Sequence, residues 1–158
     1  MHTGIDIGMG CTFIVTLNDS AEKIKFDYFG TITNSEFNRA THYHLAARHL
    51  LYYKRICDYF DSIVGTVVIE HPMGDFGGNR ARLGELFGYT LIAMAERFEP
   101  CKILLPKAKE IKLNFTGNGN ADKDSMIKEC KRRGYYPKNE HEADAIAMAF
   151  MSLGKNIS

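Results

Sequence analysis

The sequence predicts an α/β fold built on a mixed five-stranded sheet, with three antiparallel strands followed by two parallel strands and with helices at its flanks. Alternating, β-branched segments within 3–17 and 23–30 are interrupted by turn residues, which is the pattern of two consecutive hairpins. Two apolar runs, 66–72 and 101–106, are typical of buried strands. Because a strand that follows a long crossover helix usually runs parallel to its neighbour, these runs complete the sheet.

Size and composition predict one compact domain, 1–158, with a core of its own, since 45% of the residues are hydrophobic. No apolar run approaches the length of a membrane span, and the first residues lack the pattern of a signal peptide. We therefore expect a cytoplasmic protein without membrane contact. The four cysteines show no CxxC spacing, which argues against a zinc site and against a disulfide framework.

The first strand carries a single carboxylate, Asp6, between Ile5 and Ile7. A charge on a strand that enters a core is costly unless a cation, hydrogen-bond donors or a metal compensates it. The alternative is a turn aspartate that caps the bend at Gly8 and Gly10. The stretch alone leaves both interpretations open.

A long helix is predicted over 37–60, capped by Asn34 or Ser35, because its apolar residues recur at helical spacing. Its histidines, interpreted as surface or packing residues rather than metal ligands, are His42, His44 and His49.

The strand 66–72 ends in a second carboxylate, Glu70, and is stopped by Pro72. If this strand lies parallel to the first, Asp6 and Glu70 converge at the carboxyl ends of neighbouring strands, where active sites of such sheets gather. The glycine-rich loop that follows contains Met73 and Phe76, and an exposed aromatic residue beside a cleft can stack on bases.

A second helix is predicted over 79–98, with a stripe of small residues that permits close packing: Ala81, Gly84 and Gly88. The strand 101–106 follows, and then a basic segment around a Gly117 and Gly119 turn. Between Cys101 and Lys138 there are ten Lys or Arg against four Asp or Glu, although the whole chain has a net charge of only +1. Such a block suits phosphate binding, although charge alone favours an ordinary solvated helical face. Its lysines of interest are Lys107, Lys109, Lys112 and Lys123.

Two further helices are predicted, a short one over 121–133 that ends at Gly134 and an alanine-rich one over 140–154. In the last helix His141 and Asp144 are three residues apart and share a face. Alone, this pair would be an ordinary first-turn charge near the helix dipole. Together with two strand carboxylates it forms a cluster that would repel itself unless divalent cations were bound.

These motifs resemble, in order and over nearly the whole chain, the RuvC-type Holliday junction resolvases, bacterial or phage-type, which have the ribonuclease H-like fold. The first-strand GIDIG, the strand end VVIE and the terminal HEADAIA resemble the family's acidic motifs. The helix NRARLGELFG resembles one that packs across a homodimer, and the segment KEIKLNFTGNGNADK resembles a DNA-backbone contact segment. The chain departs from the pattern at Met73, where bacterial members usually carry an aromatic residue.

The resemblance implies a metal-dependent endonuclease acting on branched DNA, especially four-way junctions, in a bacterial cell or phage-infected host. It implies Asp6, Glu70, His141 and Asp144 as catalytic metal ligands, holding two Mg²⁺ per subunit with Mn²⁺ as a possible substitute. It also implies that Lys109, Lys112 and Lys123 contact the DNA backbone. Lys107, Met73 and Phe76 are added as candidate DNA contacts from their positions in the chain. A homodimer would present paired sites to a two-fold junction.

Three alternatives remain open from the sequence. One is a non-catalytic junction-binding module, and another is a nuclease of the same fold that acts on structured RNA. The third is a nucleotide-binding fragment of the actin and sugar-kinase class, because the hairpin of 4–17 resembles that class's phosphate-binding hairpin. The short chain argues against the third, and we expect no nucleotide cofactor.

Overall fold

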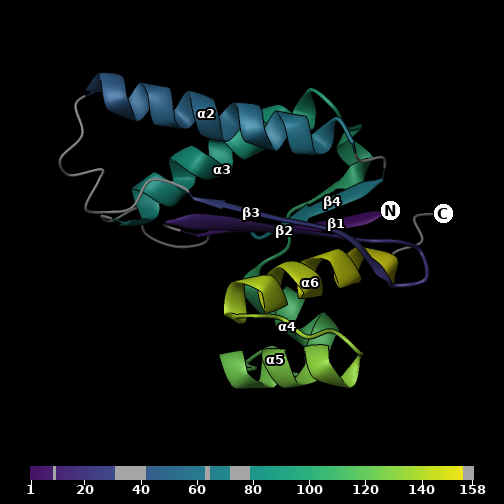
Figure 1. The fold of residues 1–158 in the computed structure, drawn as a ribbon. Helices are drawn as coiled ribbons and strands as arrows, with labels where there is room; N and C mark the ends of the chain where they lie inside the picture. The colour runs from purple at the N-terminus through teal and green to yellow at the C-terminus, as the bar shows by residue number, and fades with distance from the viewer. Residues whose placement is uncertain (9, 31–41, 63–64, 72–78, 155–158) are drawn as a thin grey trace.

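The computed structural model describes residues 1–8, 10–30, 42–62, 65–71 and 79–154. Its five-stranded sheet has the order β3-β2-β1-β4-β5 (Figure 1). Neighbours among the first three strands in the chain are antiparallel, and the β1–β4 and β4–β5 pairs are parallel, which confirms the predicted sheet. The strands are β1 (His2–Ile7), β2 (Cys11–Leu17), β3 (Lys23–Gly30), β4 (Thr66–Ile69) and β5 (Ile103–Leu104).

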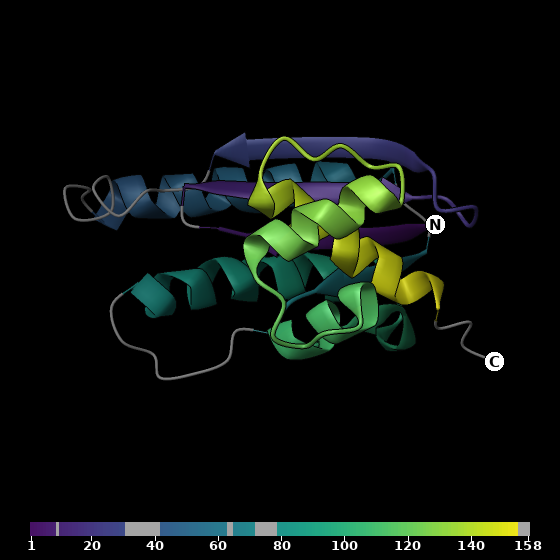
Figure 2. The same ribbon diagram turned by 90° about the horizontal axis from the view of Figure 1, so that it is seen from below.

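Helices cover the sheet on both faces. On one face lie α2 (His42–Phe60) and α3 (Asn79–Ala95). On the other lie α4 (Ala108–Thr116), α5 (Lys123–Arg132) and α6 (Glu140–Leu153). Seen from that side, α5 lies in front of α6, which covers the sheet itself (Figure 2). None of the helices in these described ranges is both long enough and apolar enough to cross a bilayer.

Strand alternation divides the buried side chains between two cores. Ile14 belongs to the core under α2 and α3, whereas its neighbours Phe13 and Val15 belong to the core under α6. Successive residues of a strand point to opposite faces, so this division follows from the pleat. The same rule predicts the face on which Asp6 and Glu70 must lie.

The last helix approaches the sheet more closely than any side chain at Gly4 would allow. A Cβ at Gly4 would lie 2.0 Å from the carbonyl oxygen of Ala145 and 2.4 Å from the backbone nitrogen of Ala149. Ala145, Ala147 and Ala149 are fully buried. Small residues on both elements therefore let the backbone of α6 rest on β1.

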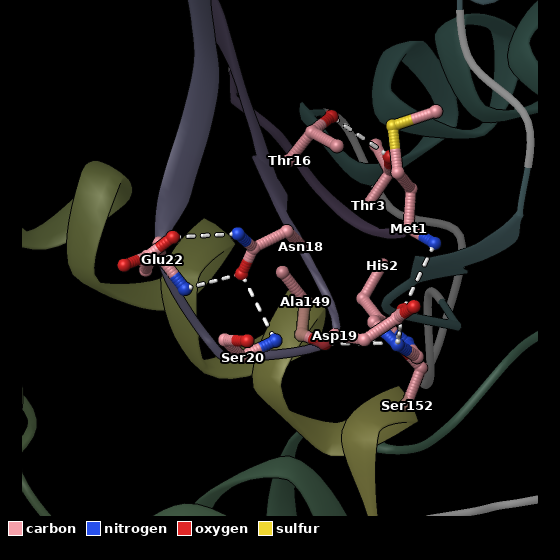
Figure 3. A network of polar contacts seen from close by, with 10 residues as sticks. All are labelled: Met1, His2, Thr3, Thr16, Asn18, Asp19, Ser20, Glu22, Ala149 and Ser152. Atoms are coloured by element: carbon pink, nitrogen blue, oxygen red, sulfur yellow. Dashed lines mark hydrogen bonds and ion pairs between the residues drawn. The ribbon is translucent and has the colours of Figure 1, made fainter.

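Polar contacts hold the far end of α6 against the start of the sheet (Figure 3). His2 joins three elements, since its Nδ1 lies 2.8 Å from Ser152 Oγ and its Nε2 lies 3.1 Å from Asp19 Oδ1. Ser152 donates a further hydrogen bond to the carbonyl oxygen of Ala149. The β2–β3 turn closes locally, because the Asn18 side chain accepts the backbone N–H groups of Ser20 and Glu22. The position of α6 along the sheet is thus fixed at this end.

Several predicted boundaries differ from the structure. The basic segment after residue 107, for which no helix was predicted, contains α4, because Ile111 and Phe115 bury one helical stripe. The last strand is only two residues long, since a 3₁₀ turn occupies Pro100–Lys102. Apart from the backbone of its own helix, a Cβ at Gly88 would meet no atom within 4 Å, so the described part of the chain does not make the close packing predicted there. The predicted caps Asn34 and Ser35 lie outside the described residues.

Candidate active site

Asp6 lies near the end of β1 on the face that α6 covers. Ile5 before it is buried under α2 and α3, and Gly4 two residues earlier touches α6, so the pleat directs Asp6 toward α6. Its side chain is 17% exposed. The Asp6 carboxylate accepts a hydrogen bond from His141, with 2.8 Å between Oδ2 and Nδ1. Asp6 is therefore held in the site by a side chain of the last helix.

Glu70 follows directly after β4. Ile5 of β1 pairs with Ile69 of β4, so Asp6 and Glu70 each come one residue after this pair, at the same ends of two parallel strands. Val68 belongs to the core under α6, and Glu70 lies two residues further along the chain. The predicted convergence of the two strand ends is confirmed by this register.

The first turn of α6 brings His141 and Asp144 to the same place. Asn139 caps this helix, because its side chain accepts the backbone N–H of Glu142. The His141 ring stacks on Phe13 of β2, with 5.6 Å between ring centroids and 15° between ring planes. Phe13 thus limits the rotation of the ring while Asp6 binds its Nδ1.

The charges in this cluster are not balanced. The pKa of Glu70 is raised to about 7, first by burial and then by the negative charges of Asp6 and Asp144. The pKa of Asp144 is raised to about 6, first by burial and then by Asp6. Lys112 of α4 opposes both shifts. Part of Glu70 is exposed, so solvent screens some of the repulsion between Glu70 and the other two carboxylates.

The pKa of the His141 imidazole is also raised, which in a base favours the charged form. The chief cause is the hydrogen bond that the charged ring keeps to Asp6. A protonated ring would partly neutralise the carboxylates, and a neutral ring could instead bind a metal through a free nitrogen. The site can therefore hold a positive charge beside the carboxylates with His141 either protonated or bound to a metal.

The donor chemistry of the cluster fits a divalent cation. Three carboxylates and one imidazole are a donor set that suits Mg²⁺ or Mn²⁺. A bound cation would offset the burial cost and the repulsion that together raise two of the pKa values. In the described ranges, no three His, Cys, Asp or Glu side chains already surround a point that could hold a metal ion. The residue types and their charges support a metal site, and the side chains would have to close further around an ion.

The four predicted DNA-contact lysines occupy different environments. Lys107 is exposed at the start of α4, and Lys112 is half-buried beside the carboxylates. Lys123 is exposed and forms an ion pair with Glu140, next to His141 in the chain. The aliphatic stem of Lys109 packs under the following turn, where a Cβ at Gly119 would lie 2.8 Å from its Cγ.

Chain geometry explains both glycines of this turn. Gly117 ends α4 in the left-handed region, with φ of 79°, and its N–H bonds the carbonyl oxygen of Leu113. Gly119 leaves space for the lysine stem. Their presence does not require a phosphate. Met73 and Phe76, also predicted to contact DNA, lie outside the described residues.

Sequence reasoning missed four residues around this site. Glu142 on α6 is 2% exposed and forms an ion pair with Lys23 of β3, with 2.9 Å between Nζ and Oε1. Its second oxygen accepts the backbone N–H of Lys138 at 2.9 Å. An acidic residue inside an alanine-rich helix was the available signal. The other two missed residues, Phe13 and Tyr28, stack on each other with 5.4 Å between centroids.

Known proteins resemble this chain in sequence and in fold. No family model matches the chain. A crossover junction endodeoxyribonuclease RuvC from Legionella pneumophila is 31% identical over 151 residues, covering 92% of this chain and 82% of the relative. The RuvC of Anaeromyxobacter sp. (strain K) is 39% identical over 74 residues, which are 46% of this chain and only 39% of that relative.

Two solved structures share the fold. The Thermus thermophilus RuvC structure superposes with a TM-score of 0.72 at 19% identity, covering 94% of this chain and 90% of that one. T. thermophilus RuvC in complex with a Holliday junction substrate gives the same TM-score and identity, with 96% and 92% covered. The fold is therefore the ribonuclease H-like fold of these proteins. Since the Legionella relative is matched over most of both chains, this chain belongs to the RuvC family of crossover junction endodeoxyribonucleases.

Proposed function

We propose that this protein is a single-domain, structure-selective endodeoxyribonuclease that resolves four-way and other branched DNA junctions. The observation that carries the proposal is the cluster of Asp6, Glu70, Asp144 and His141, where burial and then mutual repulsion raise the pKa values of two carboxylates. A binding module has no need for such an unbalanced cluster. Membership of the RuvC family supports the choice of branched DNA as substrate.

In this proposal the chain supplies oxygen ligands from two strand ends and one helix. Asp6 is fixed by His141, and its charge contributes to the raised pKa values of both Glu70 and Asp144. Two Mg²⁺ ions per subunit, or Mn²⁺ in their place, would polarise the attacking water and offset the charge on the leaving 3′ oxygen. Lys112 and Lys123 lie beside the cluster and would hold the phosphates that flank the cut.

A homodimer would complete the function. A four-way junction has approximate two-fold symmetry, so two copies related by a two-fold axis would place one cluster on each of two strands. Paired nicks would then release two duplexes. The solved T. thermophilus complex with a Holliday junction substrate supports this substrate for the family fold.

The test is metal-dependent cleavage by the full chain. A labelled four-way junction, a linear duplex and a branched RNA are incubated with Mg²⁺, Mn²⁺ or EDTA, and the cuts are mapped. The proposal expects paired nicks near the branch in either metal and none in EDTA. Asp6→Asn keeps the hydrogen bond to His141 but removes a charge, so cleavage is lost while junction binding stays within about threefold. The matched control is Asp19→Asn, an exposed aspartate in the β2–β3 turn, away from the cluster.

The rival functions give different outcomes in the same experiment. Tight junction binding without cleavage in either metal would indicate a binding module. Cleavage of branched RNA in preference to DNA would indicate the RNA nuclease. Binding of ATP without any nucleic-acid interaction would indicate the nucleotide-binding class and refute the proposal.

A further inference from the structure

Three strands align a row of side chains that leads from the candidate active site to the sheet edge. In the strand register, Asp6 of β1 lies opposite Phe13 of β2, and Phe13 lies opposite Tyr28 of β3. All three therefore lie on the face that α6 covers. Since neighbouring strands are about 4.8 Å apart, Tyr28 is displaced by about 10 Å from the strand of Asp6.

The rings in this row form a continuous stack. His141, hydrogen-bonded to Asp6, stacks on Phe13 with 15° between ring planes, and Phe13 stacks on Tyr28 with 26° between planes. Phe13 is 5% exposed, whereas Tyr28 is 58% exposed. The stack is thus closed at the carboxylate end and open to solvent at Tyr28.

An exposed tyrosine at this position suits a specific kind of ligand. Every nucleobase has a π-face, so an aromatic ring beside a nucleic-acid path can stack on an unpaired base without reading its sequence. An open branch point offers such bases, and the distance from Asp6 suits a nucleotide near the phosphate that is cut. β3 is an edge strand, so no further strand of the described sheet lies over Tyr28 on its outer side.

We propose that Tyr28 is a stacking site for an unpaired nucleobase of the DNA strand that is held at Asp6. This inference rests on the proposed nuclease function and adds a binding contact outside the carboxylate cluster. The competing explanation is that Tyr28 merely covers Phe13. The two explanations differ in what they require of residue 28: a base-stacking site needs an aromatic face, whereas a cover needs only apolar bulk.

The test measures junction binding by the full chain in EDTA, so that no DNA is cut. The probes are a four-way junction and a single-stranded oligonucleotide, each with a fluorescent adenine analogue whose emission falls on stacking; the junction carries it beside the branch. Tyr28→Phe keeps the ring and should bind both like the wild type. Tyr28→Leu keeps apolar cover, and we expect about tenfold weaker binding, with the analogue remaining bright. The control is Tyr136→Leu, because Tyr136 is 76% exposed and lies in a different region, after α5.

The outcomes separate this inference from the proposed function. If Tyr28→Leu binds the probes as tightly as the wild type does, the stacking site is overturned and the nuclease proposal is unaffected. Equal weakening in Tyr28→Leu and Tyr136→Leu also overturns it, since the effect would not be specific. A wild-type protein that binds neither probe overturns both proposals. Thermal unfolding of each variant shows whether it is folded, and Tyr28→Phe provides a folded variant in which the ring is retained.

Discussion

The ion pair between Lys23 and Glu142 gives a sharp test of how α6 is held. Glu142 is 2% exposed and Lys23 is 34% exposed, so the carboxylate depends on its protein partners and the ammonium group does not. Lys23→Met leaves the buried carboxylate with the backbone N–H of Lys138 as its remaining donor. Removing one partner of a buried pair costs about 3–5 kcal/mol, and because this pair is partly open to water we expect about 2–3 kcal/mol.

The converse change should cost less. Glu142→Gln keeps an oxygen for the Lys138 N–H and removes the charge, while Lys23 turns to solvent, so we expect about 1 kcal/mol. The double variant should therefore be more stable than Lys23→Met alone, because no unpaired charge is left in the interior. Exposed ion pairs contribute little to the free energy of unfolding. The control is Lys102→Met, because the partner of Lys102, Glu99, is exposed and 3.7 Å away. This change should alter stability by less than about 0.5 kcal/mol.

Urea denaturation of the four variants measures these differences. For a chain of this length, each kcal/mol corresponds to about 2–4 °C in Tm, so thermal unfolding gives an independent check. A free energy of unfolding for Lys23→Met within about 0.5 kcal/mol of the wild type would show that the ion pair does not hold α6. A double variant less stable than Lys23→Met would show that the cost does not come from an unpaired charge.

Two more predictions concern the same helix and its site. Gly4→Ala places a Cβ 2.0 Å from the Ala145 carbonyl oxygen, so it should lower the free energy of unfolding, measured in urea, by more than about 3 kcal/mol. The control Gly88→Ala, inside a helix, should be neutral or stabilising by up to about 1 kcal/mol. In metal-free protein, Glu70 and Asp144 keep their protons to higher pH when folded than when unfolded, so stability should fall as pH rises from about 4 to 7. Mg²⁺ should then raise Tm more at pH 8 than at pH 5, and an equal shift at both values would count against binding at these carboxylates.

Much of the fold could be predicted because its signals are local. The alternation in β1, β2 and β3 indicated hairpins, and the apolar run of β4 after a long helical pattern indicated a parallel strand. The helix α4 was missed because its lysines and glycines outweighed its short apolar stripe, Ile111 and Phe115. A nine-residue helix with two buried residues has a weak periodic signal, and tertiary packing decides its conformation.

The site could be predicted only in part. Strand ends and helical spacing indicated Asp6, Glu70, His141 and Asp144 as neighbours, since each rule acts within one or two elements. The stack of Phe13 and Tyr28 depends on the register between strands, and a shift lies between Thr16 and Leu17 in the β2–β3 pair. The sequence does not specify such a shift, so residues opposite each other across three strands could not be identified in advance.

The close fit of α6 on β1 affects how inactive variants can be interpreted. The helix that carries His141 and Asp144 also supplies fully buried alanines to the core, so a substitution at either surface can displace the same side chains. A genetic screen for loss of nuclease activity would therefore recover packing positions such as Gly4 alongside the carboxylates. Only a comparison of folded variants, purified and matched for stability, would distinguish residues that perform chemistry from residues that hold the helix in place.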